Sequence, residues 1–130
     1  MLFIHAGFMI AGFCLMAVGI ATAMFMRGRS WWLRVHRRCE TVALICVFLG
    51  LATALFMVSR HGGPHFSIPH AWLGLAAGIA AACTYLIGRF QMKTGGARMR
   101  PLHRWAGRLT VAMLLLNLLS GLSLIGLLQL

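Results

Sequence analysis

Apolar residues fill four long stretches of this chain, which short polar segments separate. The stretches cover residues 2–26, 31–58, 69–90 and 101–128. Each exceeds the ~20 residues that a helix needs to cross a hydrocarbon layer. A helix also satisfies its backbone hydrogen bonds internally, as a lipid environment requires. The pattern therefore predicts an all-α membrane protein, a four-helix up-down transmembrane bundle in which residues 1–130 form a single domain.

The overall composition excludes an ordinary soluble domain. Apolar residues make up 61% of the chain, above the ~45–50% that is typical of soluble domains. The first stretch has neither a basic region before it nor a small-residue cleavage site, so we expect it to be retained as a membrane helix.

Basic residues gather in two of the three polar segments. The net charge is +11, with a single acidic residue. Arg60 alone lies between the second and third stretches, whereas the other bases flank the first and third turns: Arg27, Arg29, Arg34, Arg37, Arg38, Arg89, Lys93, Arg98, Arg100, Arg104 and Arg108. The positive-inside rule places those two turns in the cytoplasm and both termini on the non-cytoplasmic side. The bases then serve topology and lipid contact rather than nucleic-acid binding. We expect a multi-pass protein of the bacterial inner membrane.

A histidine lies in the first turns of each predicted helix. In an up-down bundle, His5 and His70 share the outer level, and His36 and His103 share the cytoplasmic level. Ionisable residues inside a membrane are costly, which makes these four functional candidates. Two histidines from two helices can ligate one haem iron. For any one of them alone, a helix-end histidine that reaches the interface remains the simpler interpretation.

Small residues recur fourteen and eighteen positions after each histidine. They are Gly19, Ala23, Gly50, Ala54, Thr84, Gly88, Asn117 and Gly121. At 1.5 Å per residue these positions lie roughly 21–27 Å further along each helix, near the opposite histidine level. A flat macrocycle needs such room from the helices that do not ligate it. Small-residue packing between membrane helices is the alternative explanation.

The other candidate groups give weaker signals. Cys14, Cys39, Cys46 and Cys83 form no Cys-x-x-Cys motif, so neither a zinc ribbon nor covalent haem attachment is available. His61 and His65 lie in a glycine- and proline-bearing loop, where surface histidine is the simpler interpretation and a proton-handling or ligand role the alternative.

Each apolar stretch also carries a short pattern around its histidine, and the four patterns follow in order. The first two are His5-Ala6-Gly7-Phe8-Met9, and Trp32 with His36, Glu40 and Gly50. The last two are His70-Ala71-Trp72-Leu73-Gly74, and His103 with Gly107, Arg108, Asn117 and Gly121. This ordered set resembles the core of the cytochrome b-561 family, in its eukaryotic-type form, over nearly the whole chain.

The resemblance implies two haem b groups with bis-histidine ligation, His5 with His70 and His36 with His103, and transmembrane electron transfer. Asn117 matches the family pattern and joins the cofactor-binding candidates. Haem propionates need cationic partners, and the arginines nearest to the cytoplasmic histidines are Arg34, Arg37, Arg100 and Arg104. On the outer side the nearby polar candidates are Arg60, His61, His65 and Ser67.

These features predict an electron-transfer protein, or a relay subunit of a membrane oxidoreductase, without catalytic side chains. Its partners would be lipid, other redox subunits, and a donor and acceptor such as a quinol, an ascorbate-like reductant, a cytochrome or a metal complex. Two alternatives remain open, a small proton-coupled transporter using Glu40 and a non-redox structural subunit. Glu40 lies near the cytoplasmic edge rather than the midplane, where transporter sites usually lie. Local charge balance is the simpler interpretation of Glu40, and a hydrogen bond to His36 or a propionate-linked network is the functional one.

Overall fold

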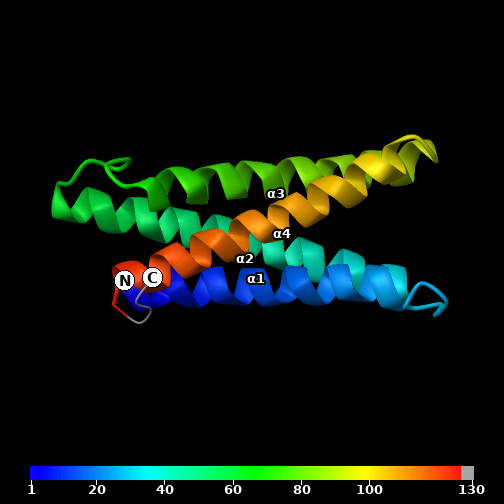
Figure 1. The fold of residues 1–130 in the computed structure, drawn as a ribbon, viewed down its shortest axis with the longest axis horizontal. Coiled ribbons are helices and arrows are strands. Elements are labelled where there is room, and N and C mark those ends of the chain that lie inside the picture. The colour runs from blue at the N-terminus through cyan, green and yellow to red at the C-terminus, as the bar shows by residue number, and fades with distance from the viewer. Residues whose placement is uncertain (127–130) are drawn as a thin grey trace.

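The computed structural model describes residues 1–126, which form four helices. They are α1 (Leu2–Phe25), α2 (Trp32–His61), α3 (Pro69–Thr94) and α4 (Met99–Leu124). All four are long and apolar enough to cross a membrane. Consecutive helices run in opposite directions, so that the N-terminus, the α2–α3 loop and the end of α4 lie at one end of the bundle (Figure 1). The predicted four-helix up-down transmembrane bundle is confirmed.

The helix ends differ from the hydropathy prediction by a few residues. α2 continues to His61 rather than residue 58, and α3 to Thr94 rather than residue 90. Both helices stop at a glycine in the left-handed region, Gly62 with φ 68° and Gly95 with φ 63°, a conformation that glycine adopts without steric cost. α4 begins at Met99 and ends at Leu124, before the expected residue 128; residues 127 and 128 lie outside the described part. Hydropathy marks the apolar part of a helix, whereas its ends depend on local backbone geometry.

The helices pack as two hairpins. α1 lies along α2 and α3 lies along α4, and the hairpins meet where α2 contacts α3 and where α1 contacts α4. α1 and α3 are therefore diagonal neighbours across the bundle, as are α2 and α4. The buried apolar side chains are mostly small or flexible: Met9, Met16, Ala43, Val47, Ala77, Ala81 and Leu114. Small residues let membrane helices approach closely, since lipid offers little hydrophobic force between them.

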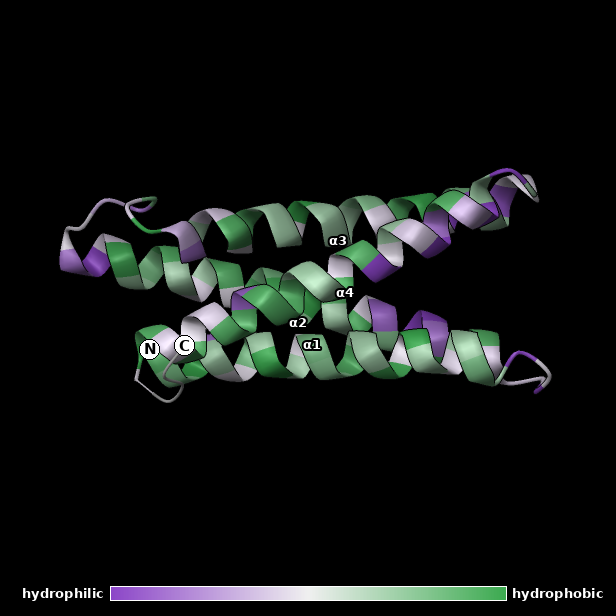
Figure 2. Ribbon diagram, viewed as in Figure 1, coloured by the Kyte–Doolittle hydropathy of each residue, from purple (hydrophilic) through white to green (hydrophobic). Residues whose placement is uncertain are grey.

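Hydrophilic residues collect towards the ends of the bundle, and the middle of each helix is mostly apolar (Figure 2). The end with the α1–α2 and α3–α4 turns carries the basic clusters, so we call it the cytoplasmic end and the opposite one the outer end. Large apolar side chains such as Phe3, Leu86 and Leu109 are exposed on the bundle surface, with 86%, 63% and 61% of their area accessible. Such a surface suits lipid.

Candidate functional site: two histidine pairs

Two pairs of histidines lie between diagonal helices, one pair at each end of the bundle. The cytoplasmic pair consists of His36 on α2 and His103 on α4, whose ring centroids are 6.1 Å apart with planes at 73°. The outer pair consists of His5 on α1 and His70 on α3, with centroids 6.3 Å apart and planes at 86°. The structure thus brings together the two pairs that the sequence predicted.

The separation within each pair suits one metal ion between two imidazoles. A metal–imidazole bond is about 2 Å long, so a metal with one ring on each side holds the ring centroids roughly 6 Å apart. Bis-histidine ligation of haem iron has this form. Both ring separations are therefore compatible with one iron between two imidazoles.

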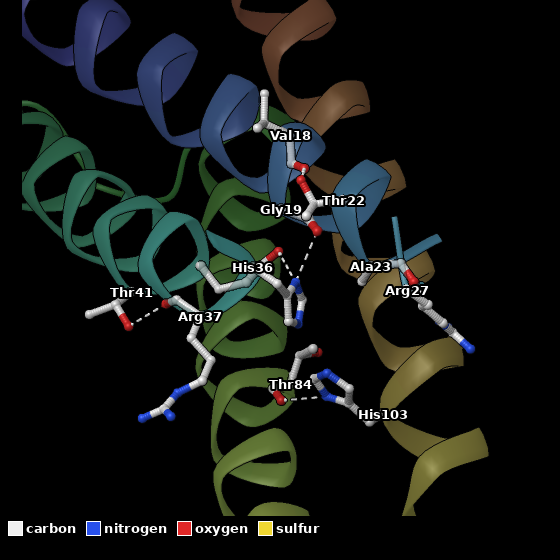
Figure 3. A network of polar contacts seen from close by, with 11 residues as sticks. Val18, Gly19, Thr22, Ala23, Arg27, His36, Arg37, Thr41, Thr84 and His103 are labelled. Carbon is white, nitrogen blue, oxygen red and sulfur yellow. Dashed lines mark hydrogen bonds and ion pairs between the residues drawn. The ribbon is translucent and has the colours of Figure 1, made fainter. Parts of the chain in front are cut away.

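Hydrogen bonds fix the orientation of the imidazoles. Three histidines bind a backbone carbonyl of the neighbouring helix through Nδ1: His5 that of Gly50 at 2.8 Å, His36 that of Gly19 at 2.9 Å and His103 that of Thr84 at 3.1 Å. A carbonyl can only accept, so these Nδ1 atoms carry the proton and donate it. Nε2 then keeps its lone pair for a metal, and the hydrogen bond makes the ring a stronger ligand. Figure 3 shows this arrangement at the cytoplasmic pair.

The small residues near the opposite histidine level have a role that the sequence did not predict. A Cβ atom at Gly88 would lie 2.7 Å from Cε1 of His103, and one at Gly121 would lie 2.9 Å from Cε1 of His70. Gly19 and Gly50, fourteen residues after a histidine, supply the carbonyls described above. These positions let an imidazole approach the neighbouring backbone. The expectation that they also leave room for a macrocycle stays a prediction.

A cavity of about 1310 Å³ opens beside the cytoplasmic pair. Both His36 and His103 line it, together with the four arginines predicted from their proximity in sequence, Arg34, Arg37, Arg100 and Arg104. Four further arginines that the sequence argument did not select also line it: Arg27, Arg38, Arg89 and Arg108. The cavity therefore offers many cationic partners for the propionates of a haem or for another anion.

The outer end is different. A smaller cavity of about 390 Å³ lies at the α2–α3 loop, and His61 and Ser67 line it, but His5 and His70 do not. The loop histidines make local contacts, His61 Nδ1 with the carbonyl of Met57 at 2.8 Å and His65 Nε2 with the Ser59 hydroxyl at 2.9 Å. His61, expected in the loop, is instead the last residue of α2, and His65 lies in the loop after it.

Glu40 lies one helical turn after His36, beside the cytoplasmic cavity. Its Oε1 is 3.6 Å from His36 Nδ1, too far for a hydrogen bond, and the Gly19 carbonyl holds that proton instead. Among residues 1–126 no arginine forms an ion pair with Glu40, and its Oε1 is buried without a hydrogen-bond partner. The hydrogen bond to His36 considered from the sequence is thus not formed, nor is a direct ion pair with Arg37 or Arg38.

Asn117 is buried between α3 and α4, with 1% of its area accessible. Its side chain lies against Gly74, where an added Cβ would be 3.3 Å from Nδ2. Its backbone carbonyl accepts a hydrogen bond from Ser120 at 2.9 Å, and Ser120 in turn contacts His70. Ser120 was not predicted, because a serine near the end of an apolar helix is an ordinary residue there. Counting along the helix from His103 leads to Asn117 and Gly121 but not to Ser120.

Comparison with known proteins agrees with this arrangement. The model of the eukaryotic cytochrome b561 family matches residues 4–124. The chain belongs to this family, whose members bind haem b and transfer electrons across membranes. A relative from Mus musculus, the lysosomal membrane ascorbate-dependent ferrireductase, is 24% identical over 132 residues.

That alignment covers 92% of this chain and 54% of the mouse protein, so the chain spans about half the length of this relative. No solved structure matches the chain. The name of the relative places it in a lysosomal membrane, so the comparisons do not support the expected bacterial inner membrane. The fold and the family establish an integral, multi-pass membrane protein.

Proposed function

We propose that this chain carries electrons across the membrane through two haem b groups, one held by His36 and His103 and the other by His5 and His70. The observation that carries the proposal is the repeated geometry of the two pairs. Each joins diagonal helices, with ring centroids 6.1 or 6.3 Å apart. All four Nδ1 atoms already have hydrogen-bond partners, which leaves Nε2 of every ring available.

The side chains determine what such a site can do. With His36 and His103 or His5 and His70 as its ligands, a haem would relay electrons rather than bind oxygen or a substrate. The haem supplies a one-electron change of its iron, and the bundle supplies fixed ligands and an apolar surround. Gly19 lies fourteen residues after His5 and holds His36 at the cytoplasmic level. The outer and cytoplasmic histidine levels are therefore roughly 21 Å apart along the helix axis. The chain therefore serves as a relay between partners that meet it at its two ends.

The arginine-lined cavity supports an anionic electron donor at the cytoplasmic end. Eight arginines surround it: Arg27, Arg34, Arg37, Arg38, Arg89, Arg100, Arg104 and Arg108. A small anion such as an ascorbate-like reductant suits this charge. The mouse relative is named as an ascorbate-dependent ferrireductase. We propose a reductant of that class as donor and a ferric complex, or a partner redox protein, as acceptor at the outer end.

Vesicles test this proposal directly. The purified protein is reconstituted into proteoliposomes with ascorbate sealed inside, and a membrane-impermeant ferric complex is added outside. We expect reduction of the external iron that depends on the protein and fails with His70→Ala or His103→Ala. A wild-type protein that contains two haems but transfers no electrons across the bilayer would contradict the proposed function.

A further inference from the structure

The outer histidine pair differs from the cytoplasmic pair in one hydrogen-bond partner, the side chain of Ser120. His5, His36 and His103 bind backbone carbonyls, whereas His70 Nδ1 lies 2.9 Å from the hydroxyl oxygen of Ser120. Ser120 is on α4 and His70 is on α3, so the contact joins the two helices of the second hairpin. Among the Nδ1 contacts of these four histidines, the one to Ser120 is the only contact with a side chain.

The direction of this hydrogen bond follows from the neighbouring one. The Ser120 hydroxyl also lies 2.9 Å from the backbone carbonyl of Asn117. That carbonyl can only accept, so Ser120 donates its single proton to it. Towards His70, Ser120 can then only accept, and Nδ1 of His70 must be the donor. Because Nδ1 of His70 carries the proton, Nε2 keeps its lone pair. The other three histidines reach the same state through their carbonyl partners.

The resulting chain of hydrogen bonds runs from His70 through Ser120 to Asn117. Asn117 lies fourteen residues after His103, the position whose carbonyl serves a histidine directly in the other three cases. Ser120 therefore contacts both the ring of His70 and the carbonyl at that position. Consecutive hydrogen bonds polarise one another, so the hydroxyl is a better acceptor than an isolated serine. The adjacent Gly121 leaves space for the ring, since a Cβ there would lie 2.9 Å from His70 Cε1.

We propose that Ser120 is a positioning residue for the outer haem, which fixes the proton and the plane of the His70 ring and tunes the electron affinity of the iron that this ring ligates. The inference rests on the proposed function, because it requires a haem at the outer pair. A serine that bonds to its own helix three residues back is common in membrane helices. The second contact, to a histidine fifty residues earlier in the chain, gives Ser120 a further role.

Removal of the hydroxyl should change the potential of one haem. An acceptor on Nδ1 makes an imidazole a stronger ligand, which favours ferric iron. Ser120→Ala should therefore raise the midpoint potential of the outer haem. We expect a change of up to about tenfold in the equilibrium between reduced and oxidised iron, which is about 59 mV for a one-electron couple.

Three variants of the full chain separate positioning from packing. Ser120→Ala removes the acceptor and Ser120→Thr keeps a hydroxyl at the same position. Ser123→Ala alters a serine one turn further along α4 and is the matched control. Each purified protein is titrated potentiometrically, and the electron paramagnetic resonance of the oxidised haems reports the mutual orientation of the axial rings, which lie at 86° in the outer pair.

We expect Ser120→Ala to shift the potential and resonance of the outer haem, with the cytoplasmic haem unchanged, and Ser120→Thr and Ser123→Ala to resemble the wild type. Loss of the outer haem in Ser120→Ala, with retention in Ser120→Thr, would support the same role. Unchanged signals in Ser120→Ala, or equal effects in Ser123→Ala or Ser120→Thr, would overturn the inference. A wild type with fewer than two haems would instead refute the proposed function, whatever the variants show.

Discussion

The two histidine pairs share one geometry but lie in different electrostatic surroundings. Their ring centroids are separated by nearly the same distance, 6.1 Å at the cytoplasmic end and 6.3 Å at the outer end. The cytoplasmic pair borders a cavity of about 1310 Å³ with eight lining arginines, the set named above. At the outer end the chain offers Arg60 as its one basic residue in the α2–α3 region. The two pairs thus have the same ring separation although the charge around them differs.

The shared geometry comes from a reciprocal arrangement within each hairpin. In α1 and α2, the carbonyl of Gly19 holds His36 and the carbonyl of Gly50 holds His5. In α3 and α4, the carbonyl of Thr84 holds His103, and Ser120 mediates the corresponding contact to His70. Three of these four contacts use backbone carbonyls, which every residue carries. The charge around each pair depends on side chains and on the side of the membrane.

The largest expected effect is the loss of one whole haem. Replacement of His5 or His70 by alanine should remove the same spectral component, and replacement of His36 or His103 should remove the other. The reason is the proposed ligation of one iron by each pair. Difference spectra of the four variants check this, with the cytoplasmic component as internal control for the outer variants. If His5→Ala and His36→Ala removed the same component, the pairing across diagonal helices would be wrong.

Glycine substitutions should affect one level at a time. Gly88→Ala places a Cβ 2.7 Å from His103 Cε1 and Gly121→Ala places one 2.9 Å from His70 Cε1. Disturbing the contacts that orient a metal ligand typically costs about 10–100-fold in affinity, so we expect such a loss at the cytoplasmic and the outer site respectively. Haem titration of the apo-protein measures it.

Gly107→Ala is the matched control, because a Cβ there would lie 3.8 Å from Thr84 Cγ2, an ordinary contact. Equal losses in all three variants would indicate general damage to helix packing rather than loss of imidazole space.

Removal of cytoplasmic arginines should shift only the cytoplasmic haem. Arg100→Gln or Arg104→Gln deletes a positive charge from the cavity wall, and positive charge stabilises the reduced site, which carries one more electron. We therefore expect the midpoint potential of the cytoplasmic haem to fall. Each arginine removed should shift the equilibrium between reduced and oxidised haem by about two- to fivefold, the scale of an exposed charge pair. The shift should shrink as ionic strength rises.

Arg60→Gln at the outer end should leave the cytoplasmic potential unchanged in the same potentiometric titrations. An equal response of both haems to Arg104→Gln would argue against separate electrostatic surroundings.

The smallest effect is expected at Glu40. Its Oε1 is 3.6 Å from His36 Nδ1, whereas the Gly19 carbonyl is at 2.9 Å. Because the nearer carbonyl holds the ring, Glu40→Gln should keep both haems and change vesicle electron transfer by no more than about twofold. Pyranine-loaded vesicles examine the transporter alternative in parallel. Protein-dependent proton uptake that Glu40→Gln abolishes would favour that alternative.

Much of this arrangement could be predicted from the sequence. Apolar stretches of sufficient length determine the helices, and the alternation of their direction places His5 with His70 and His36 with His103. The arginines near those histidines in sequence also line the cytoplasmic cavity. Each of these results depends on position along a helix, which the order of residues encodes directly.

Other features could not be predicted because they depend on how helices face one another. The carbonyls of Gly19 and Gly50 cannot be seen in a residue pattern, so the sequence did not predict that these two glycines would hold imidazoles. Ser120 is unremarkable in α4 until α3 brings His70 to 2.9 Å from its hydroxyl. Glu40 is near His36 in sequence, yet the backbone of α1 takes the contact that proximity suggested.

The number of haems per chain shows whether each histidine pair binds its own iron. The purified protein is assayed by pyridine haemochrome against quantitative amino-acid analysis, and the haem is extracted with acidified acetone. Two histidine pairs and no Cys-x-x-Cys motif predict two haem b groups per chain, both extractable. One haem per chain, no haem, or haem that resists extraction would contradict the binding of one haem b by each histidine pair.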